Sequence, residues 1–253
     1  MTSKALDALR IVLVGTQHPG NIGSAARAMK TMGLSRLCLV TPECATDADE
    51  ARAMAVGAED LIGTALRADV LDDALADCTQ VYGCTARRRH VALPEWTPRE
   101  AAARAIAEVQ AGGTVALLFG RERSGLSNDE LQRCHAAIHI PTNPEFSSLN
   151  LAAAVQVLSY ELRLAALAAA EPPPPAERGD PPATQAELEG LFEHLDRALV
   201  AIDFHKGRSP VTVLRRLRRL FLRARLNERE VRILHGILAD AERMARLAAE
   251  RRQ

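Results

Sequence analysis

Ser147, Ser148 and Asn150 carry hydroxyl and amide groups that could bind a polar ligand in the most distinctive segment of this chain. Pro141 and Pro144 precede them and stop both a strand and a helix, because proline has a fixed φ and no N–H group. A long Ala/Val/Leu pattern at helical spacing follows. We therefore expect a serine to cap the new helix, whose free N–H groups attract oxygen-rich ligands. An ordinary helix cap after a proline turn accounts for the same residues.

Two further stretches combine glycine with polar and charged side chains. Asn21, Gly23 and Arg27 follow the first apolar run, and the spacing places Arg27 nearly two turns into a helix that Asn21 can cap. Glu122 lies in the loop 120–125, which has a glycine at each end. Taken singly, a surface arginine and a charged turn are the ordinary explanations. The loop has neither a GxGxxG pattern nor a Walker lysine, so nucleotide phosphates are not its natural ligand.

Short apolar runs that read as strands alternate with helical patterns through the first part of the chain. Continuous apolar strands of this kind are typical of a parallel sheet that helices cover on both faces. In such a sheet the ligand binds beyond the carboxyl ends of the strands, so we expect the polar loops 84–86, 120–125 and 140–149 to converge on one site. The expected strands are 10–15, 36–40, 79–83, 114–119 and 136–140, and the main helices are 21–32, 47–58, 71–76, 97–111 and one that begins near residue 150.

Composition limits the classes of protein to which the chain can belong. It has 253 residues, of which 47% are hydrophobic and 25% charged, as in an ordinary globular protein. No apolar run is long enough to cross a membrane, and the first residues lack the apolar region of a signal peptide. The five cysteines form no CxxC pair and the histidines no ligand pattern. We therefore expect a cytoplasmic protein with no disulfide framework, no metal and no membrane partner.

Positive charge is concentrated at one end of the chain. The formal total is zero, but residues 205–253 contain fourteen Lys and Arg against five acids. Within them the segment 211–226 is an amphipathic, strongly basic helical pattern, which points to a polyanionic partner. A solvated helix face is the ordinary explanation, although such a face usually carries acids as well. The arginines expected to contact phosphates there are Arg215, Arg216, Arg218, Arg219 and Arg223.

A proline-rich stretch separates two expected domains. The segment 171–183, EPPPPAERGDPPA, reads as a semi-rigid linker with little tendency to fold. Before it we expect an α/β domain at 1–170. After it we expect a helical, basic domain at 184–253 with three helical patterns, which the charge makes a polyanion-binding domain.

Three separated motifs, NIGSAAR at 21–27, LLFGRERSGLSNDEL at 117–131 and IPTNPEFSSLN at 140–150, occur in this order. Together they resemble the motif set of the SPOUT superfamily of S-adenosylmethionine-dependent RNA methyltransferases, in its TrmH-like 2′-O-ribose branch. The resemblance covers residues 8–165. It implies a trefoil knot at the end of the α/β domain, where periodicity alone predicts an open sheet. It also implies a homodimer through the knotted domain, in which each site borrows residues from the partner.

The resemblance implies roles for individual residues. The matching Asn21 and Arg27 hold the target ribose and phosphate in the family. Because an arginine is always charged, we favour a positioning role for Arg27 over that of general base, whose identity stays open. Cys84 stands where the family usually has a small hydroxyl residue, which favours backbone contacts there, and Glu122 serves catalysis or holds an arginine. The expected catalytic set is Asn21, Arg27, Glu122, Ser148 and Asn150, and the expected cofactor set is Cys84, Thr85, Ala86, Gly120, Ile140, Ser147, Ser148 and Leu149.

The resemblance also implies an activity. The details of the three motifs are most like the subgroup that methylates tRNA at the nucleotide opening the anticodon loop, a cytidine or uridine at position 32. Arg27 and the basic segment would then contact the RNA. Two alternatives are an rRNA 2′-O-methyltransferase and an RNA-binding protein that has lost catalysis. The intact set of candidate catalytic residues speaks against the second alternative.

Overall fold

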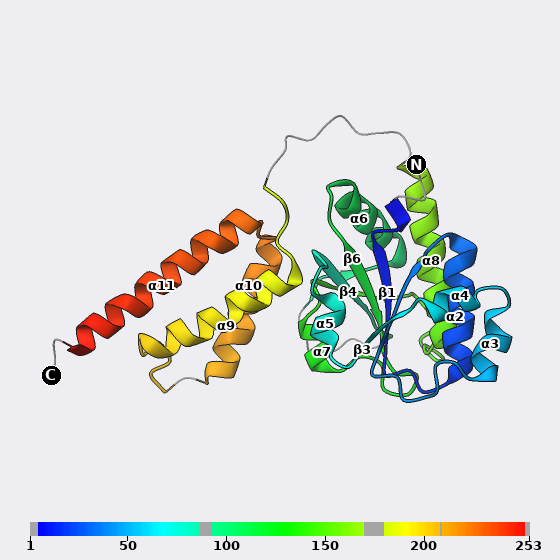
Figure 1. Cartoon of the computed structure of the whole chain (residues 1–253), viewed down its shortest axis with the longest axis horizontal. Coiled ribbons are helices and arrows are strands. Elements are labelled where there is room, and N and C mark those ends of the chain that lie inside the picture. The colour runs from blue at the N-terminus through cyan, green and yellow to red at the C-terminus, as the bar shows by residue number, and fades with distance from the viewer. Residues whose placement is uncertain (1–4, 87–92, 170–179, 208, 251–253) are drawn as a thin grey trace. The chain divides into compact units, whose positions relative to one another are not determined.

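The computed structural model describes residues 5–86, 93–169, 180–207 and 209–250. The chain divides into two compact units, Met1–Glu177 and Arg178–Gln253 (Figure 1). The first unit alternates strands with helices, and the second contains helices in its described part. Each unit has its own apolar core, so each can be described by itself.

One parallel sheet forms the centre of the first unit. Its strands pair in the order β3-β2-β1-β6-β4-β7-β5. The parallel sheet and the five expected strands are confirmed. The two short edge strands, β3 and β5, escaped prediction because so few residues leave no alternating or apolar run to detect. The strands are β1 (Leu9–Val14), β2 (Arg36–Val40), β3 (Leu66–Ala68), β4 (Gln80–Cys84), β5 (Glu95–Trp96), β6 (Val115–Phe119) and β7 (Ala136–Ile138).

Helices cover both faces of this sheet, as the continuous apolar strands predicted. Leu9, Ile11 and Leu13 of β1 point into one cluster, with α2 and α8, whereas Val12 and Val14 point into the other, with α5 and α7. Figure 1 shows the two helix layers on opposite sides of the sheet. The helices of this unit are α2 (Pro19–Met32), α3 (Asp49–Ala55), α4 (Glu59–Gly63), α5 (Leu71–Leu75), α6 (Pro98–Gln110), α7 (Asn128–Gln132) and α8 (Leu151–Ala168).

Two local predictions about these helices are wrong. The helix expected at 47–58 is shorter, because Val56 and Gly57 have positive φ values of 39° and 83° that end α3 at Ala55, and the separate helix α4 begins only beyond the expected range, at Glu59. Asn21 does not cap α2, because the helix begins at Pro19 and His18 is the capping position. By contrast, Thr97 and Ser127 cap α6 and α7, each with a capping box.

Helix α8 is the longest helix of the first unit and follows the Ser147–Asn150 segment. By length and composition it could cross a membrane. Its apolar residues Val155, Leu158 and Leu162 are fully buried in the core of this unit instead. The helix therefore connects the candidate site to the core. The order of paired strands does not describe how the chain threads, so the trefoil knot stays a prediction.

The second unit packs α9 (Gln185–Ala201), α10 (Pro210–Ala224) and α11 (Glu228–Glu250) around a small core that includes Leu188, Leu191 and Phe192. Residues 181–183 were expected in the linker, but they belong to this unit. The Ala183 N–H donates to the Leu226 carbonyl at 2.9 Å, and the Glu228 N–H donates to the Pro181 carbonyl at 3.0 Å. Ala183 is also buried in the core. Residues 171–179 of the expected linker lie outside the described residues.

Candidate functional site

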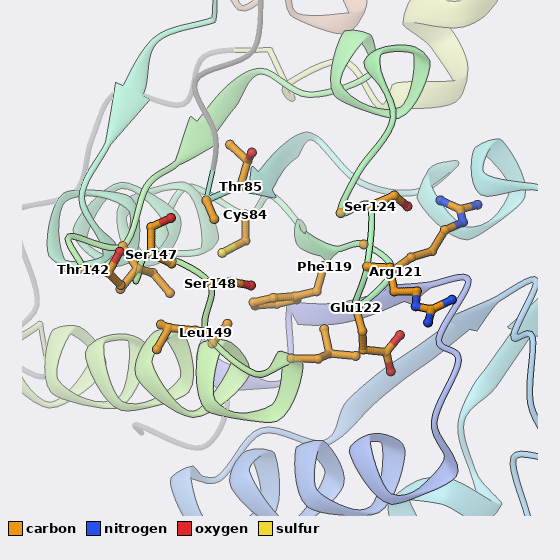
Figure 2. A pocket seen from close by; sticks show the side chains of 17 residues that line it. Cys84, Thr85, Phe119, Arg121, Glu122, Ser124, Thr142, Ser147, Ser148 and Leu149 are labelled. Carbon is orange, nitrogen blue, oxygen red and sulfur yellow. Dashed lines mark hydrogen bonds between the residues drawn. The ribbon is translucent and has the colours of Figure 1, made fainter. Parts of the chain in front are cut away.

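One pocket lies at the carboxyl ends of β4, β6 and β7 (Figure 2). Each of the three loops singled out in the sequence contributes to it, so the expectation that they converge is met. All eight residues of the expected cofactor set line it. The lining is Cys84, Thr85, Ala86, Phe119, Gly120, Arg121, Glu122, Arg123, Ser124, Gly125, Ile140, Thr142, Ser147, Ser148, Leu149, Leu151 and Ala154.

The pocket wall includes apolar residues that the motif analysis missed. Phe119 is the last residue of β6, and Leu151 and Ala154 lie on one face of the first turn of α8. The sequence could have indicated Leu151 and Ala154, because apolar residues three positions apart share one face of a helix. Burial raises the pKa of the Cys84 thiol to about 12, so Cys84 is a neutral, mostly apolar part of the wall.

The glycine-bounded loop is held in shape by its own backbone. The Gly125 N–H donates to the Arg121 carbonyl at 2.8 Å. A Cβ atom on Gly120 would lie 2.2 Å from the Gly125 carbonyl carbon, so only glycine fits there. This close approach joins the two ends of the loop, and Gly120 also lines the pocket. This packing keeps the loop closed against the end of β6.

Arg121 anchors this loop and is not free to bind a ligand. Its Nη1 donates to Glu130 at 2.9 Å, and its Nε donates to Glu43 at 3.3 Å. The hydrogen bond to Glu130 is the largest cause of the raised pKa of Arg121, so this side chain stays protonated and positively charged. In Figure 2 the side chain points away from Ser148 and Leu149. Arg121 therefore ties the loop to α7 and to the segment after β2.

Glu122 organises the start of α2. Its carboxylate accepts hydrogen bonds from the Gln17 N–H at 2.9 Å, the His18 N–H at 3.2 Å and the Asn21 amide at 2.8 Å. Burial raises the pKa of Glu122, but these hydrogen bonds outweigh it, so the pKa lies below its ordinary value. Glu122 was expected either to serve catalysis or to hold an arginine. Within the described chain, none of its hydrogen bonds is to an arginine. A carboxylate already engaged by three donors is a weak proton acceptor.

Asn150 continues this chain of hydrogen bonds to α8. Its Nδ2 donates to the Asn21 Oδ1 at 2.9 Å, and its Oδ1 accepts from the N–H groups of Ala152 at 2.9 Å and Ala153 at 3.3 Å. The expectation that a serine caps α8 is therefore wrong, because the longer asparagine side chain fills that position. Ser147 and Ser148 are left to line the pocket.

Arg27 lies outside this network. It is exposed on α2, and its side chain makes no hydrogen bond or ion pair within the part of the chain that the structure describes. It is also absent from the pocket lining, as are Asn21 and Asn150. Gly23, in the same motif, has a packing role, because a Cβ atom there would lie 2.0 Å from the Ala51 carbonyl oxygen of α3. The structure thus brings Asn21, Glu122 and Asn150 together and leaves Arg27 apart from them.

The basic helix α10 presents only part of its charge to solvent. Arg215, Arg216 and Arg223 are exposed and Arg219 is half-exposed. Arg218 instead forms an ion pair with Glu189 of α9, with one nitrogen–oxygen distance of 2.7 Å. Its guanidinium carbon also lies 4.6 Å above the centre of the Phe192 ring. These arginines were expected to act as one set, and the tertiary structure separates Arg218 from the rest.

Comparison with known families identifies the class to which this fold and pocket belong. The chain belongs to the SpoU rRNA Methylase family, whose model matches residues 8–160, the part that holds the pocket. A second model, for the C-terminal domain of the tRNA methyltransferase TrmJ, matches residues 186–250. The matches include both units, and the chain is a methyltransferase. The resemblance inferred from the three motifs is confirmed.

Individual relatives narrow the class to TrmJ-like enzymes. The chain is 48% identical over 248 residues to the tRNA (cytidine/uridine/adenosine-2′-O-)-methyltransferase TrmJ of Pseudomonas aeruginosa, covering 95% of this chain and 96% of that protein. It is 50% identical over 239 residues to the tRNA (cytidine/uridine-2′-O-)-methyltransferase TrmJ of Klebsiella pneumoniae, covering 94% and 97%. The crystal structure of TrmJ from Z. mobilis ZM4 matches with a TM-score of 0.79 and 37% identity, covering 92% and 98%.

Proposed function

We propose that this enzyme transfers a methyl group from S-adenosylmethionine to the ribose 2′-oxygen of a cytidine or uridine in tRNA, at the nucleotide that opens the anticodon loop. The observation that carries the proposal is that the loops 84–86, 120–125 and 140–149 meet in one pocket, in a chain about half identical to TrmJ enzymes over nearly its whole length. A more distant solved structure, at 26% identity and a TM-score of 0.52, concerns 2′-OH methylation of C/U34 on tRNA.

The pocket has the chemistry that S-adenosylmethionine requires. The cofactor has no phosphate, and the pocket loop has no phosphate-binding signature. Phe119, Ile140 and Leu149 offer apolar surface to an adenine ring. Thr142, Ser147 and Ser148 lie in the same wall and offer hydroxyl groups to the ribose and the amino acid part of the cofactor. The eight residues of the expected cofactor set are proposed to hold the cofactor on this basis.

Catalysis then depends mainly on position. The bound cofactor would supply a methyl group carried by a sulfonium, and the sulfur would leave as a neutral thioether. The protein must align the 2′-oxygen with that methyl carbon and let one hydroxyl proton depart. We assign Ser148 and the Glu122–Asn21–Asn150 chain to this task, with Glu122 holding Asn21 in place. The lowered pKa of Glu122 fits a positioning carboxylate better than a general base.

We further propose that Arg27 acts in the site of a second copy of the chain. Its side chain is exposed and lies outside the pocket of its own chain, although it shares a motif with Asn21. An arginine on a neighbouring copy would supply the fixed positive charge that a ribose phosphate needs. Arg27→Ala should abolish methyl transfer without loss of cofactor binding. Mixing that variant with one disabled in the cofactor loop should restore activity in heterodimers, and a monomeric mass by light scattering would contradict this assembly.

The second unit is proposed to bind the body of the tRNA in the cytoplasm, where the substrate is found. We place the functional domains at 1–170 and 181–253, on either side of a linker that is shorter than the expected 171–183 because residues 181–183 pack with the second unit. The exposed arginines of α10 support an RNA-binding role for the second unit, because exposed arginines on one helix face make sequence-independent contacts to phosphates.

Mass spectrometry of nucleosides tests the function directly. Total tRNA and rRNA from a strain lacking the protein are compared with those from the parent strain, and the purified enzyme is then supplied with tRNA transcripts. We expect loss and restoration of a 2′-O-methylated pyrimidine in tRNA, mapped to position 32 by digestion. Loss at position 34 or in rRNA would contradict the proposed substrate, and unchanged nucleosides with no activity in vitro would contradict catalysis.

A further inference from the structure

Phe146 leaves 80% of its surface exposed, more than any other large apolar side chain that the structure describes. Single exposed apolar residues are common on proteins and often need no explanation. Here, however, the whole chain contains five Phe, two Tyr and one Trp. An aromatic ring with this exposure beside the pocket is therefore a candidate contact for a second substrate.

The loop that carries Phe146 is held in a defined turn. The Phe146 N–H donates to the Asn143 carbonyl at 3.0 Å, and the Glu145 N–H donates to the Asn143 side chain at 3.1 Å. The Thr142 hydroxyl closes the loop by donating to the Ser147 carbonyl at 3.1 Å. The backbone at Phe146 is thus positioned before any ligand arrives, which reduces the entropy lost on binding.

Phe146 lies next to the pocket but is not part of its wall. Thr142 and Ser147, on either side of it in the chain, both line the pocket. Phe146 itself is absent from the lining. Its ring is consequently available to a molecule that approaches the pocket mouth, and is not taken up by the molecule that fills the pocket.

We propose that Phe146 stacks on the base of the target nucleotide and so positions the attached ribose for methylation. This inference rests on the proposed function. Every nucleobase has a π face, so stacking on an aromatic ring holds a base without reading its hydrogen-bonding edge. Cytidine and uridine differ at that edge and not in the face of the ring. A stacking contact is therefore suited to a site that accepts both.

A double-mutant cycle tests the contact. One component is Phe146→Ala, and the other is a tRNA transcript whose target nucleotide keeps its ribose but lacks its base. On intact tRNA, Phe146→Ala should lower kcat/KM roughly 5- to 150-fold, the range expected for loss of one stacked base. On the abasic tRNA the same substitution should change kcat/KM less than about twofold, because the contact is already gone. Phe146→Tyr should restore most of the activity on intact tRNA.

Leu66→Ala is the matched control, since Leu66 is another exposed apolar residue, 46% exposed, on the edge strand β3 far along the sheet from the pocket strands. It should leave kcat/KM unchanged on both substrates. Equal losses for Phe146→Ala on intact and abasic tRNA would overturn the stacking role. A monomeric mass or lost S-adenosylhomocysteine binding for Phe146→Ala would overturn it too, in favour of a contact between copies or a structural role. Failure of the wild-type enzyme to methylate intact tRNA would instead overturn the proposed function, and the inference with it.

Discussion

Replacing four arginines of α10 by glutamine should flatten the salt dependence of tRNA binding. Arg215, Arg219 and Arg223 follow one another at four-residue spacing, and Arg216 lies beside them on the same helical face. Arg218 is not included, because its guanidinium is already paired with Glu189 and stacked on Phe192. The structure therefore reduces the expected phosphate contacts of the helix from five arginines to four.

The size of the effect follows from counterion release. Each phosphate contact contributes roughly 0.7 to 0.9 to the slope of log K against log salt concentration, so four contacts contribute about 3 units. Between about 50 mM and 200 mM salt, the advantage of the wild-type protein over the variant should then shrink roughly 50- to 150-fold. The variant should still bind S-adenosylhomocysteine, because the pocket belongs to the other unit.

Filter binding of one tRNA transcript across a salt series measures this slope. The matched control replaces four exposed arginines of α11, Arg229, Arg232, Arg243 and Arg246, by glutamine, which removes the same net charge from the same unit. If the α10 face docks the RNA, the control should flatten the slope much less. Equal flattening by the two quadruple variants would refute the argument from position and leave only net charge. An unchanged slope in the α10 variant would remove this helix from the RNA interface.

Three further predictions concern the first unit and the cofactor. Calorimetric titration of the purified protein should detect binding of S-adenosylhomocysteine and none of NAD, and the reverse result would contradict the proposed cofactor. Gly23→Ala should destabilise the protein by about 1–3 kcal/mol in thermal unfolding, because the new Cβ would lie 2.0 Å from the Ala51 carbonyl oxygen. The control Gly236→Ala, whose Cβ would meet no atom within 4 Å, should instead stabilise α11 by roughly 0.5–1 kcal/mol. The pKa of Glu122 is lowered in the folded protein, so its contribution to stability is present above its ordinary pKa and is lost as the pH falls through the lowered value. Glu122→Gln should therefore lower Tm at neutral pH and reduce the loss of stability on acidification. An unchanged dependence of Tm on acid pH would contradict this role.

Much of the site could be predicted because its signals are local. Prolines and glycines interrupt the chain at fixed places, and apolar runs between them mark strands whose carboxyl ends must meet at one edge of a parallel sheet. The loops 84–86, 120–125 and 140–149 were therefore predicted to meet in one pocket, and the structure confirms that they do. The capping boxes at Thr97 and Ser127 were equally accessible, since a cap and its partner are three residues apart.

The sequence by itself thus determined the parallel sheet, the loops of the pocket and the basic character of the second unit. Tertiary structure alone decided how the polar side chains are used. Glu122 engages Asn21 across 101 positions of sequence, and Asn21 engages Asn150 across 129. Arg218 turns inward because Glu189 and Phe192 of another helix meet it there. Local spacing carries no information about such partners, because a side chain can hydrogen-bond to whichever group the fold brings within about 3 Å.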